Sequence, residues 1–248
     1  MLSLMLPRAN GFLRRALRAT GFDIKRFGPF ENPHVLRHGV MSKAGIELVI
    51  DGGANVGQYA GRLREYGYRG QILSIEPGGE AFRSLQAASS KDASWKTVCT
   101  ALGAEDGEAV LRVMHDSVSS SLMAPRPKMQ AICGPKSASE ERVPVRTLRG
   151  ILEEAGAKEM NTLLKLDVQG SEQDALIGAG ERLGDCNFLE LELAFEPLFE
   201  GQTPALELLH WLEDKGFRSV AWTPNTLDPN TGFGIEFDVI LARVRHGV

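Results

Sequence analysis

The stretch 49–60, VIDGGANVGQYA, constrains the fold of this chain more than any other part of the sequence. An apolar run over 46–50 ends at Asp51 and two glycines, and a helix-like pattern over 56–66 follows, which predicts a strand, a turn and a helix. The glycines of this turn are Gly52, Gly53 and Gly57. Glycines let a ligand approach the backbone, and the first turn of a helix presents N–H groups that have no intrahelical partner. The sequence therefore predicts a ligand site at this turn.

Two acidic residues at strand ends indicate the kind of ligand. The apolar run 72–75 ends at Glu76, which in a doubly wound sheet lies beside the first strand and can accept hydrogen bonds from both ribose hydroxyls of a nucleoside. A carboxylate at Asp51 repels a pyrophosphate but attracts the sulfonium and ammonium groups of S-adenosylmethionine. The dinucleotide pattern G-x-G-x-x-G is also absent. We therefore expect S-adenosylmethionine rather than a nicotinamide or flavin cofactor; the alternative is that the glycines serve turn geometry alone.

Composition favours one α/β domain that acts on a small molecule. The chain has 248 residues, of which 43% are hydrophobic and 24% charged, and this suits one large domain with modest additions. Its 28 Lys and Arg against 32 Asp and Glu give a net charge of -4, so we expect a small acceptor and no nucleic acid. Cysteines without paired spacing, Cys99, Cys133 and Cys186, predict reduced thiols in a cytoplasmic protein. No apolar run approaches the ~20 residues of a membrane span.

Residues 1–44 differ in composition from the rest of the chain. An apolar start over 1–6 is followed by a basic stretch over 8–26 that Asp23 alone opposes, which is the reverse of the order in a secretory signal. We predict a basic amphipathic helical arm here, followed by a domain over 45–248 with a long insertion around 115–142. Such an arm packs across its own domain more often than it contacts anionic lipid or a partner. Oligomeric state stays open.

The rest of the chain alternates predicted strands and helices, as in βαβ units. Strands are predicted at 72–75, 95–99, 109–114, 143–145, 163–167, 188–193, 218–222 and 235–243, and helices at 81–88, 171–183 and 205–212. The last two strands flank a loop rich in Pro, Asn and Gly, which predicts an antiparallel hairpin. The segment 117–142 is too long for a simple connection, and we predict a lid on the acceptor side.

Charged residues alternate with leucine on two middle strands. Lys165 and Asp167 lie on one strand, and Glu190 and Glu192 on another, although strands covered on both faces seldom carry charges. If the strands are parallel neighbours, Lys165 pairs with Glu190 inside, while Asp167 and Glu192 converge at the carboxyl edge, where ligands bind. Two carboxylates there can take the proton of an acceptor hydroxyl. A magnesium site and a buried structural ion network are the alternatives.

The histidines are candidate bases or metal ligands. His34 and His38 lie four apart after a predicted helix cap at Asn32, and they share a helical face, but ordinary surface or structural roles are favoured. His115 borders the long segment and could reach an acceptor. His210 falls off the apolar stripe of its helix and is expected to be exposed.

Four motifs together resemble one known family. They are VIDGGANVGQYA, LSIEP, LLKLDVQGSE over 163–172 and LELELAFEPLFEG over 189–201, and they resemble the successive motifs of FkbM-type methyltransferases. These S-adenosylmethionine-dependent enzymes commonly O-methylate sugars or polyketide hydroxyls. The resemblance covers about 45–243 and implies the class I methyltransferase (Rossmann-like) fold, whose seven-stranded sheet is mostly parallel with an antiparallel last strand.

The resemblance also implies roles for individual residues. Cofactor roles fall on Asp51, Gly53, Asn55, Gly57 and Glu76, and acceptor roles on Asp167 and Glu192. We extend the cofactor site to Gly52 and Pro77. Related enzymes often carry an acid after the third strand, where this chain has Thr100, Ala101 and Leu102, so backbone amides and Leu102 are expected to hold the adenine.

The expected function is therefore methylation of a hydroxyl of a sugar or other secondary metabolite, with Asp167 or Glu192 as base or metal ligand. The alternatives are a nitrogen, lipid-linked or protein acceptor, which the fold does not exclude, and a cofactor-binding module without catalysis.

Overall fold

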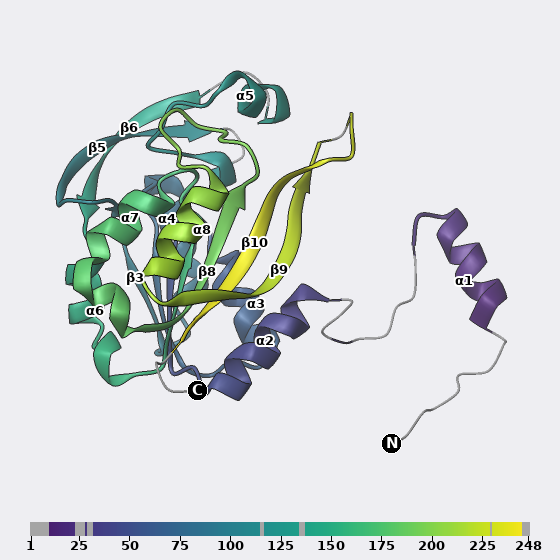
Figure 1. The fold of residues 1–248 in the computed structure, drawn as a ribbon, viewed down its shortest axis with the longest axis horizontal. Coiled ribbons are helices and arrows are strands. Elements are labelled where there is room, and N and C mark those ends of the chain that lie inside the picture. Colours follow the sequence, from purple (N-terminus) through teal and green to yellow (C-terminus); the bar gives the residue numbers. More distant parts are fainter. Residues whose placement is uncertain are drawn as a thin grey trace.

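A computed structural model describes residues 10–22, 28, 32–114, 117–133, 137–228 and 230–244. Its largest sheet contains β1 (Leu48–Gly52), β2 (Gln71–Ile75), β3 (Trp95–Val98), β7 (Thr162–Leu166), β8 (Cys186–Ala194), β9 (Phe217–Leu227) and β10 (Gly234–Arg243). The seven strands have the order β3-β2-β1-β7-β8-β10-β9, and Figure 1 shows β8, β10 and β9 as neighbours. β10 is antiparallel to both neighbours, and the other pairs are parallel. The predicted sheet, hairpin and antiparallel last strand are confirmed.

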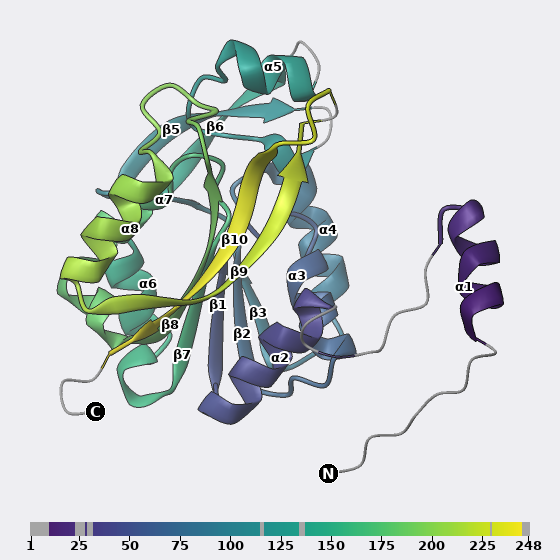
Figure 2. The same ribbon diagram turned by 45° about the vertical axis from the view of Figure 1, so that its right-hand side comes forward.

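Helices cover both faces of this sheet (Figure 2). On one face lie α2 (Pro33–Ala44), α3 (Gln58–Glu65) and α4 (Gly79–Ser89), and on the other lie α6 (Leu148–Glu154), α7 (Glu172–Ala179) and α8 (Ala205–Asp214). The core on the α2 side contains Val49 and Leu163, and the core on the other side contains Ile50 and Leu164. Because successive strand residues alternate between faces, Asp51 and Lys165 share the α2 face with Val49.

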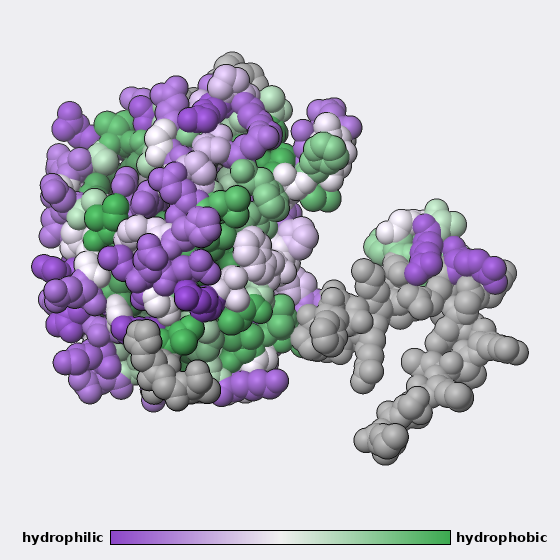
Figure 3. Space-filling view, in the orientation of Figure 1, coloured by the Kyte–Doolittle hydropathy of each residue, from purple (hydrophilic) through white to green (hydrophobic). Residues whose placement is uncertain are grey.

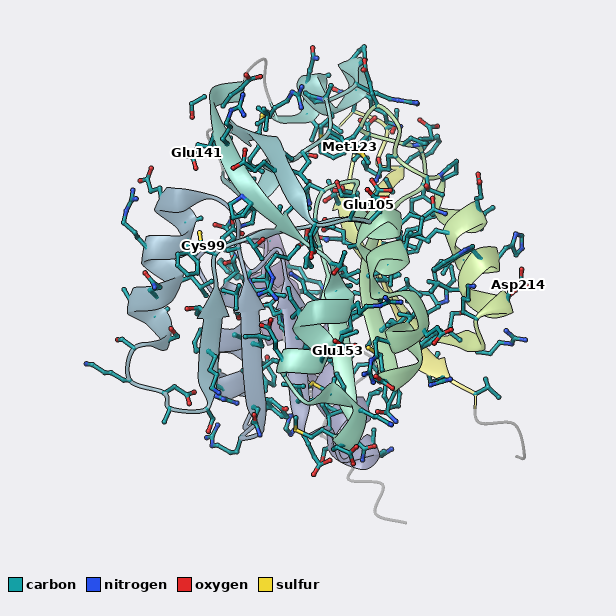
Figure 4. The ribbon with its side chains drawn as sticks, turned by 90° about the vertical axis from the view of Figure 1, so that its left-hand side faces the viewer. Cys99, Glu105, Met123, Glu141, Glu153 and Asp214 are labelled. Carbon is teal, nitrogen blue, oxygen red and sulfur yellow. The ribbon has the colours of Figure 1, made fainter. Side chains whose placement is uncertain are left out.

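A second, smaller sheet lies over the carboxyl ends of the main strands. It joins β4 (Ala101–Leu102), β6 (Ser137–Arg146) and β5 (Gly107–Met114) in the order β4-β6-β5. Figure 4 shows Glu141 on β6 above Cys99, which follows β3. Between β5 and β6 lie the 3-10 turn η1 (Ser117–Ser119) and α5 (Pro127–Cys133).

Part of the segment 115–142, which was predicted as a long insertion, belongs to the smaller sheet. Residues 137–142 belong to β6 and pair with β5, and the expected strand 143–145 is only the end of β6. The polar sequence SASEER over 137–142 gives no hydrophobic alternation, and this half of the strand pairs with β5 through the backbone. His115 lies outside the described residues.

The region predicted as an N-terminal arm divides into two described parts. α1 (Asn10–Ala19) is drawn apart from the body (Figure 1), whereas α2 packs on the sheet through buried Met41. Asn32 caps α2 as expected, because its side chain accepts a hydrogen bond from the backbone of His34 at 2.9 Å.

Figure 3 shows hydrophilic and hydrophobic residues interspersed over the face of the body seen in Figure 1. No described helix is long and apolar enough to cross a bilayer.

Candidate active site

The turn between β1 and α3 requires glycine at Gly53. Its φ is 72°, and an added Cβ would lie 1.8 Å from the backbone oxygen of Asp167, so no other residue fits. Gly57 also has a positive φ, of 91°, and both Gly52 and Gly57 lie close to neighbouring side chains. A Cβ on Gly52 would lie 2.8 Å from a methyl group of Leu166, and one on Gly57 would lie 2.9 Å from the ring of Trp95. These two glycines allow close packing of the turn.

Glu76, which follows β2, stabilises this turn through its carboxylate. Its carboxylate accepts hydrogen bonds from the backbone N–H of Asn55 at 2.9 Å and of Gly78 at 2.7 Å. Burial raises the pKa of Glu76, against the opposing effect of these two donors and of Lys165. Each carboxylate oxygen has two lone pairs, so Glu76 can still accept hydrogen bonds from a ligand.

The turn and Glu76 line a hollow that is open to solvent, which we call the turn cavity. Of the residues expected at the cofactor, those that line it are Gly53, Asn55, Glu76, Pro77, Thr100, Ala101 and Leu102. Its charged lining residues are Glu76 and Asp167, and no lysine or arginine of the described chain lines it. This charge distribution suits a cationic ligand and disfavours a pyrophosphate.

Asp51 lies beneath the turn cavity rather than in its wall. Its side chain is fully buried, and the ammonium nitrogen of Lys165 lies 3.1 Å from its Oδ1. Ser74 donates a hydrogen bond to Oδ2 at 3.2 Å. Lys165 also donates to the backbone oxygen of Gly53 at 3.1 Å. Asp51 therefore braces the turn from beneath, because burial requires a counter-charge for this carboxylate, and its cofactor role stays a prediction.

The predicted pair of Lys165 with Glu190 is wrong. The two residues are register neighbours on β7 and β8, but Lys165 turns to Asp51 on its other side. Glu190 instead binds the guanidinium of Arg37 from α2, whose Nε lies 2.7 and 2.8 Å from its two oxygens. The hydroxyl of Tyr59 donates to Glu190 at 2.7 Å. The planar donor fork of arginine satisfies a buried carboxylate better than a lysine does.

Asp167 and Glu192 converge at the carboxyl edge of the sheet, where the sequence places them. The side-chain amide of Gln169 donates to Asp167 at 2.8 Å and to Glu192 at 2.7 Å. The amide of Asn225 donates to the other oxygen of Glu192 and to Asp238 at 3.3 Å. Carboxylates and amides therefore alternate in one hydrogen-bonded chain, and the catalytic role of the pair stays a prediction.

This chain of side chains lines a second, larger space of about 1330 Å³, which we call the acidic cavity. Its carboxylates are Asp167, Glu190, Glu192, Glu236 and Asp238, and its cations are Arg37, Arg62 and Lys165. Burial, followed by the nearby carboxylate of Asp167, raises the pKa of Glu192 well above its ordinary value. Burial also raises the pKa of Asp238 to about 6.

The two cavities share part of their walls. The shared residues are Gly53, Gln58, Val118, Asp167 and Gln169. Asp167 is the one carboxylate found in both sets of lining residues, so a group transferred between the cavities would pass beside it.

Sequence reasoning missed Arg37, Gln169 and Asn225. Each acts through a contact between distant parts of the chain, which local sequence pattern does not reveal. Among the histidines, His34 lines the acidic cavity and His210 is exposed as expected. In the described part of the chain, no group of three or more His, Cys, Asp and Glu residues could hold a metal ion.

Comparisons with known proteins agree with this geometry. The model of the methyltransferase FkbM domain matches residues 51–219. The chain is 24% identical to the 2-O-methyltransferase NoeI of Sinorhizobium fredii (strain NBRC 101917 / NGR234) over 205 residues, which cover 80% of each protein. The crystal structure of methyltransferase FkbM from Methylobacillus flagellatus KT has a TM-score of 0.50 at 15% identity, covering 78% of this chain and 43% of that one.

The family match spans the glycine turn, Glu76 and the strands that carry Asp167 and Glu192. The strand order and the antiparallel β10 agree with the fold that the sequence motifs imply. The chain therefore belongs to the FkbM methyltransferase family and is an S-adenosylmethionine-dependent methyltransferase.

Proposed function

We propose that this enzyme methylates a hydroxyl group of a sugar or another secondary metabolite. The observation that carries the proposal is the shared wall of the two cavities, where Asp167 faces both sides and lies beside Glu192. The likeness to NoeI, a 2-O-methyltransferase, supports an oxygen acceptor.

The turn cavity fits S-adenosylmethionine, which supplies a methyl carbon activated by a sulfonium. Glu76 would accept hydrogen bonds from the ribose hydroxyls, and the backbone at Gly53 would leave room beside them. The wall formed by 100–102 would pack on the adenine. The carboxylates of Glu76 and Asp167 supply the negative charge that a cationic methyl donor requires.

Asp167 would take the acceptor proton. Its side chain is 34% exposed, and the ammonium of Lys165 lies 3.7 Å away. The acceptor oxygen gives its proton to Asp167 and forms a bond to the methyl carbon, while the bond from that carbon to sulfur breaks and its electron pair stays on sulfur. Alignment and proton removal are the contributions required of the protein.

The acidic cavity supports a polyhydroxylated acceptor. Its carboxylates can accept hydrogen bonds from several hydroxyl groups, whereas Arg37 is already paired with Glu190 and Lys165 with Asp51. The remaining excess of acidic groups opposes a polyanion such as nucleic acid.

The segment 117–133 forms a wall of this cavity through Val118, Met129 and Ile132. It docks on the body where the N–H of Arg126 donates to the backbone oxygen of Leu198 at 2.8 Å. A lid role for this segment remains part of the proposal. So does a cytoplasmic location, which is supported by free thiols at Cys99 and Cys186.

The deciding experiment measures release of S-adenosylhomocysteine with a panel of p-nitrophenyl glycosides, followed by NMR of the product. We expect turnover with at least one glycoside and a new O-methyl signal. Turnover only with amines, with lipid-linked sugars or with proteins would overturn the sugar acceptor. Cofactor binding without turnover on any acceptor would favour the non-catalytic module.

A further inference from the structure

Gln169 occupies a position that strains the backbone. Its φ is 53° and that of Gly170 is 101°, and a non-glycine residue in the left-handed region is uncommon. The loop is held by the buried carboxylate of Glu172, which accepts hydrogen bonds from the N–H groups of Val168 at 3.1 Å and of Gly170 at 3.2 Å. Such strain persists only where surrounding contacts enforce it, and it concentrates at functional sites.

This conformation directs the side chain of Gln169 to the junction of the two cavities. Its amide nitrogen carries two protons, and both have an acceptor, one on Asp167 and one on Glu192. Its backbone oxygen accepts a hydrogen bond from the hydroxyl of Ser121 at 2.6 Å. One residue therefore connects the segment after β5, the strand end of β7 and the strand end of β8.

The two carboxylates it joins are not equivalent. Asp167 lines both cavities, whereas Glu192 lines only the acidic cavity and is fixed on its other oxygen by Asn225. Asp167 is thus the carboxylate placed next to the methyl donor. Without a donor between them, two adjacent carboxylates would share one proton and neither would be a defined base.

We infer that Gln169 is a positioning residue that separates the roles of the pair, keeping Asp167 as the proton acceptor and Glu192 as a fixed group that orients the acceptor hydroxyl. This inference rests on the proposed hydroxyl methylation. It assigns to a neutral amide a role in the ionisation of the site, because hydrogen bonds donated to a carboxylate favour its charged form.

The charges that face Asp167 all enter this balance. They are Lys165 from its own strand, Glu172 from α7, Glu192 from β8, and Glu236 and Asp238 from β10. Lys165 is the one cation among these groups, so the carboxylates repel one another. The side-chain amides of Gln169 and Asn225 reduce this repulsion by donating hydrogen bonds to the carboxylates.

The test compares Gln169→Glu and Gln169→Leu in the pH dependence of kcat, using a glycoside from the panel that is turned over. Glutamate keeps the size but adds a charge beside Asp167, so the acid limb of the profile should move up by about one pH unit, with kcat recovering near the wild-type plateau at alkaline pH. Leucine removes both donors without adding a charge, so the acid limb should also move up, and kcat at alkaline pH should stay about 10-fold below the wild type because the pair is no longer held in position. The KM for S-adenosylmethionine should change less than about twofold in both variants.

The matched control is Gln71→Glu, an exposed glutamine at the opposite end of the sheet, where β2 begins. It makes the same chemical change away from the site and should leave the profile unchanged. Thermal unfolding of each variant verifies that the fold is retained. An acid limb at the wild-type position in Gln169→Glu, with the protein folded, would overturn the inference.

A second measurement does not depend on turnover. Carbon-13 NMR titration of the carboxyl groups should show the midpoint of Glu192, whose pKa is already raised, moving further up in Gln169→Glu and staying fixed in Gln71→Glu. If no glycoside is methylated but this shift is seen, the proposed acceptor fails and the role of Gln169 in ionisation stands. If turnover is seen and neither readout moves, the role of Gln169 fails and the proposed function stands.

Discussion

The turn cavity and the acidic cavity share a wall, but the chain builds them in different ways. The turn cavity comes from residues close together in sequence, such as Gly53 and Asn55, with Glu76 after the next strand. The acidic cavity joins Arg37 to Glu190 across 153 positions and adds side chains from the last hairpin. Under the proposed function, local motifs would hold the cofactor, whereas the acceptor would be held by contacts that only the complete fold creates.

The largest expected effect breaks the brace beneath the turn cavity. Lys165→Met leaves the buried charge of Asp51 unpaired, so the free energy of unfolding should fall by about 3–5 kcal/mol. Chemical denaturation measures it. The matched control is Lys128→Met, which removes the exposed pair with Glu196 and should cost less than about 1 kcal/mol. An equal, small loss in both variants would show that Asp51 does not depend on Lys165.

The next effect tests the wall that the cavities share. Asp167→Asn keeps the shape and removes the proton acceptor, so turnover should fall by ~10²-fold or more with little change in cofactor affinity. Glu192→Gln should cost less, about 10-fold, because Glu192 orients rather than accepts. EDTA should leave turnover unchanged, since the proposed base acts directly. Asp174→Asn, exposed on α7, serves as the control, and near-normal turnover in Asp167→Asn would make the pair structural.

A smaller effect belongs to the turn cavity alone. Glu76→Ala removes charged hydrogen bonds to the ribose and should weaken S-adenosylhomocysteine binding by roughly 1–3 kcal/mol in calorimetry. The exposed Glu80 in the first turn of α4 provides the control, because Glu80→Ala should leave the affinity unchanged. If both variants bind alike, Glu76 is not part of the cofactor site.

The smallest effect concerns the loop that carries Gln169. Burial raises the pKa of Glu172 from 4.5 to about 7. Between these values the folded state binds more protons than the unfolded state, so the free energy of unfolding falls as the pH rises and then levels off. Glu172→Gln keeps an oxygen for both N–H groups and removes this dependence. It should be more stable than the wild type by about 1 kcal/mol or more at pH 8, and equal stability at pH 5 and pH 8 in the wild type would contradict the pKa.

The difference between local motifs and long-range contacts also explains which features the sequence could predict. Strands and helices around the sheet followed from apolar periodicity, and the convergence of Asp167 and Glu192 followed from parallel strands ending at one edge. The start of β6 was missed because its polar residues pair through the backbone. The partners of Lys165 and Glu190 were misassigned because Lys165 has a carboxylate on each neighbouring strand, Asp51 on β1 and Glu190 on β8, and only the position of α2 shows that Glu190 binds Arg37.

The position of α2 has a consequence for how acceptor preference can evolve. The family match begins at 51 and ends at 219, so α2 with Arg37 and β10 with Glu236 and Asp238 lie beyond both of its ends. The residues that line the turn cavity all lie within the matched segment 51–219. Substitutions in these flanking parts could therefore change which alcohol the proposed acceptor site recognises without altering the turn cavity. A chain trimmed to 51–219 would lose six of the 21 residues that line the acidic cavity.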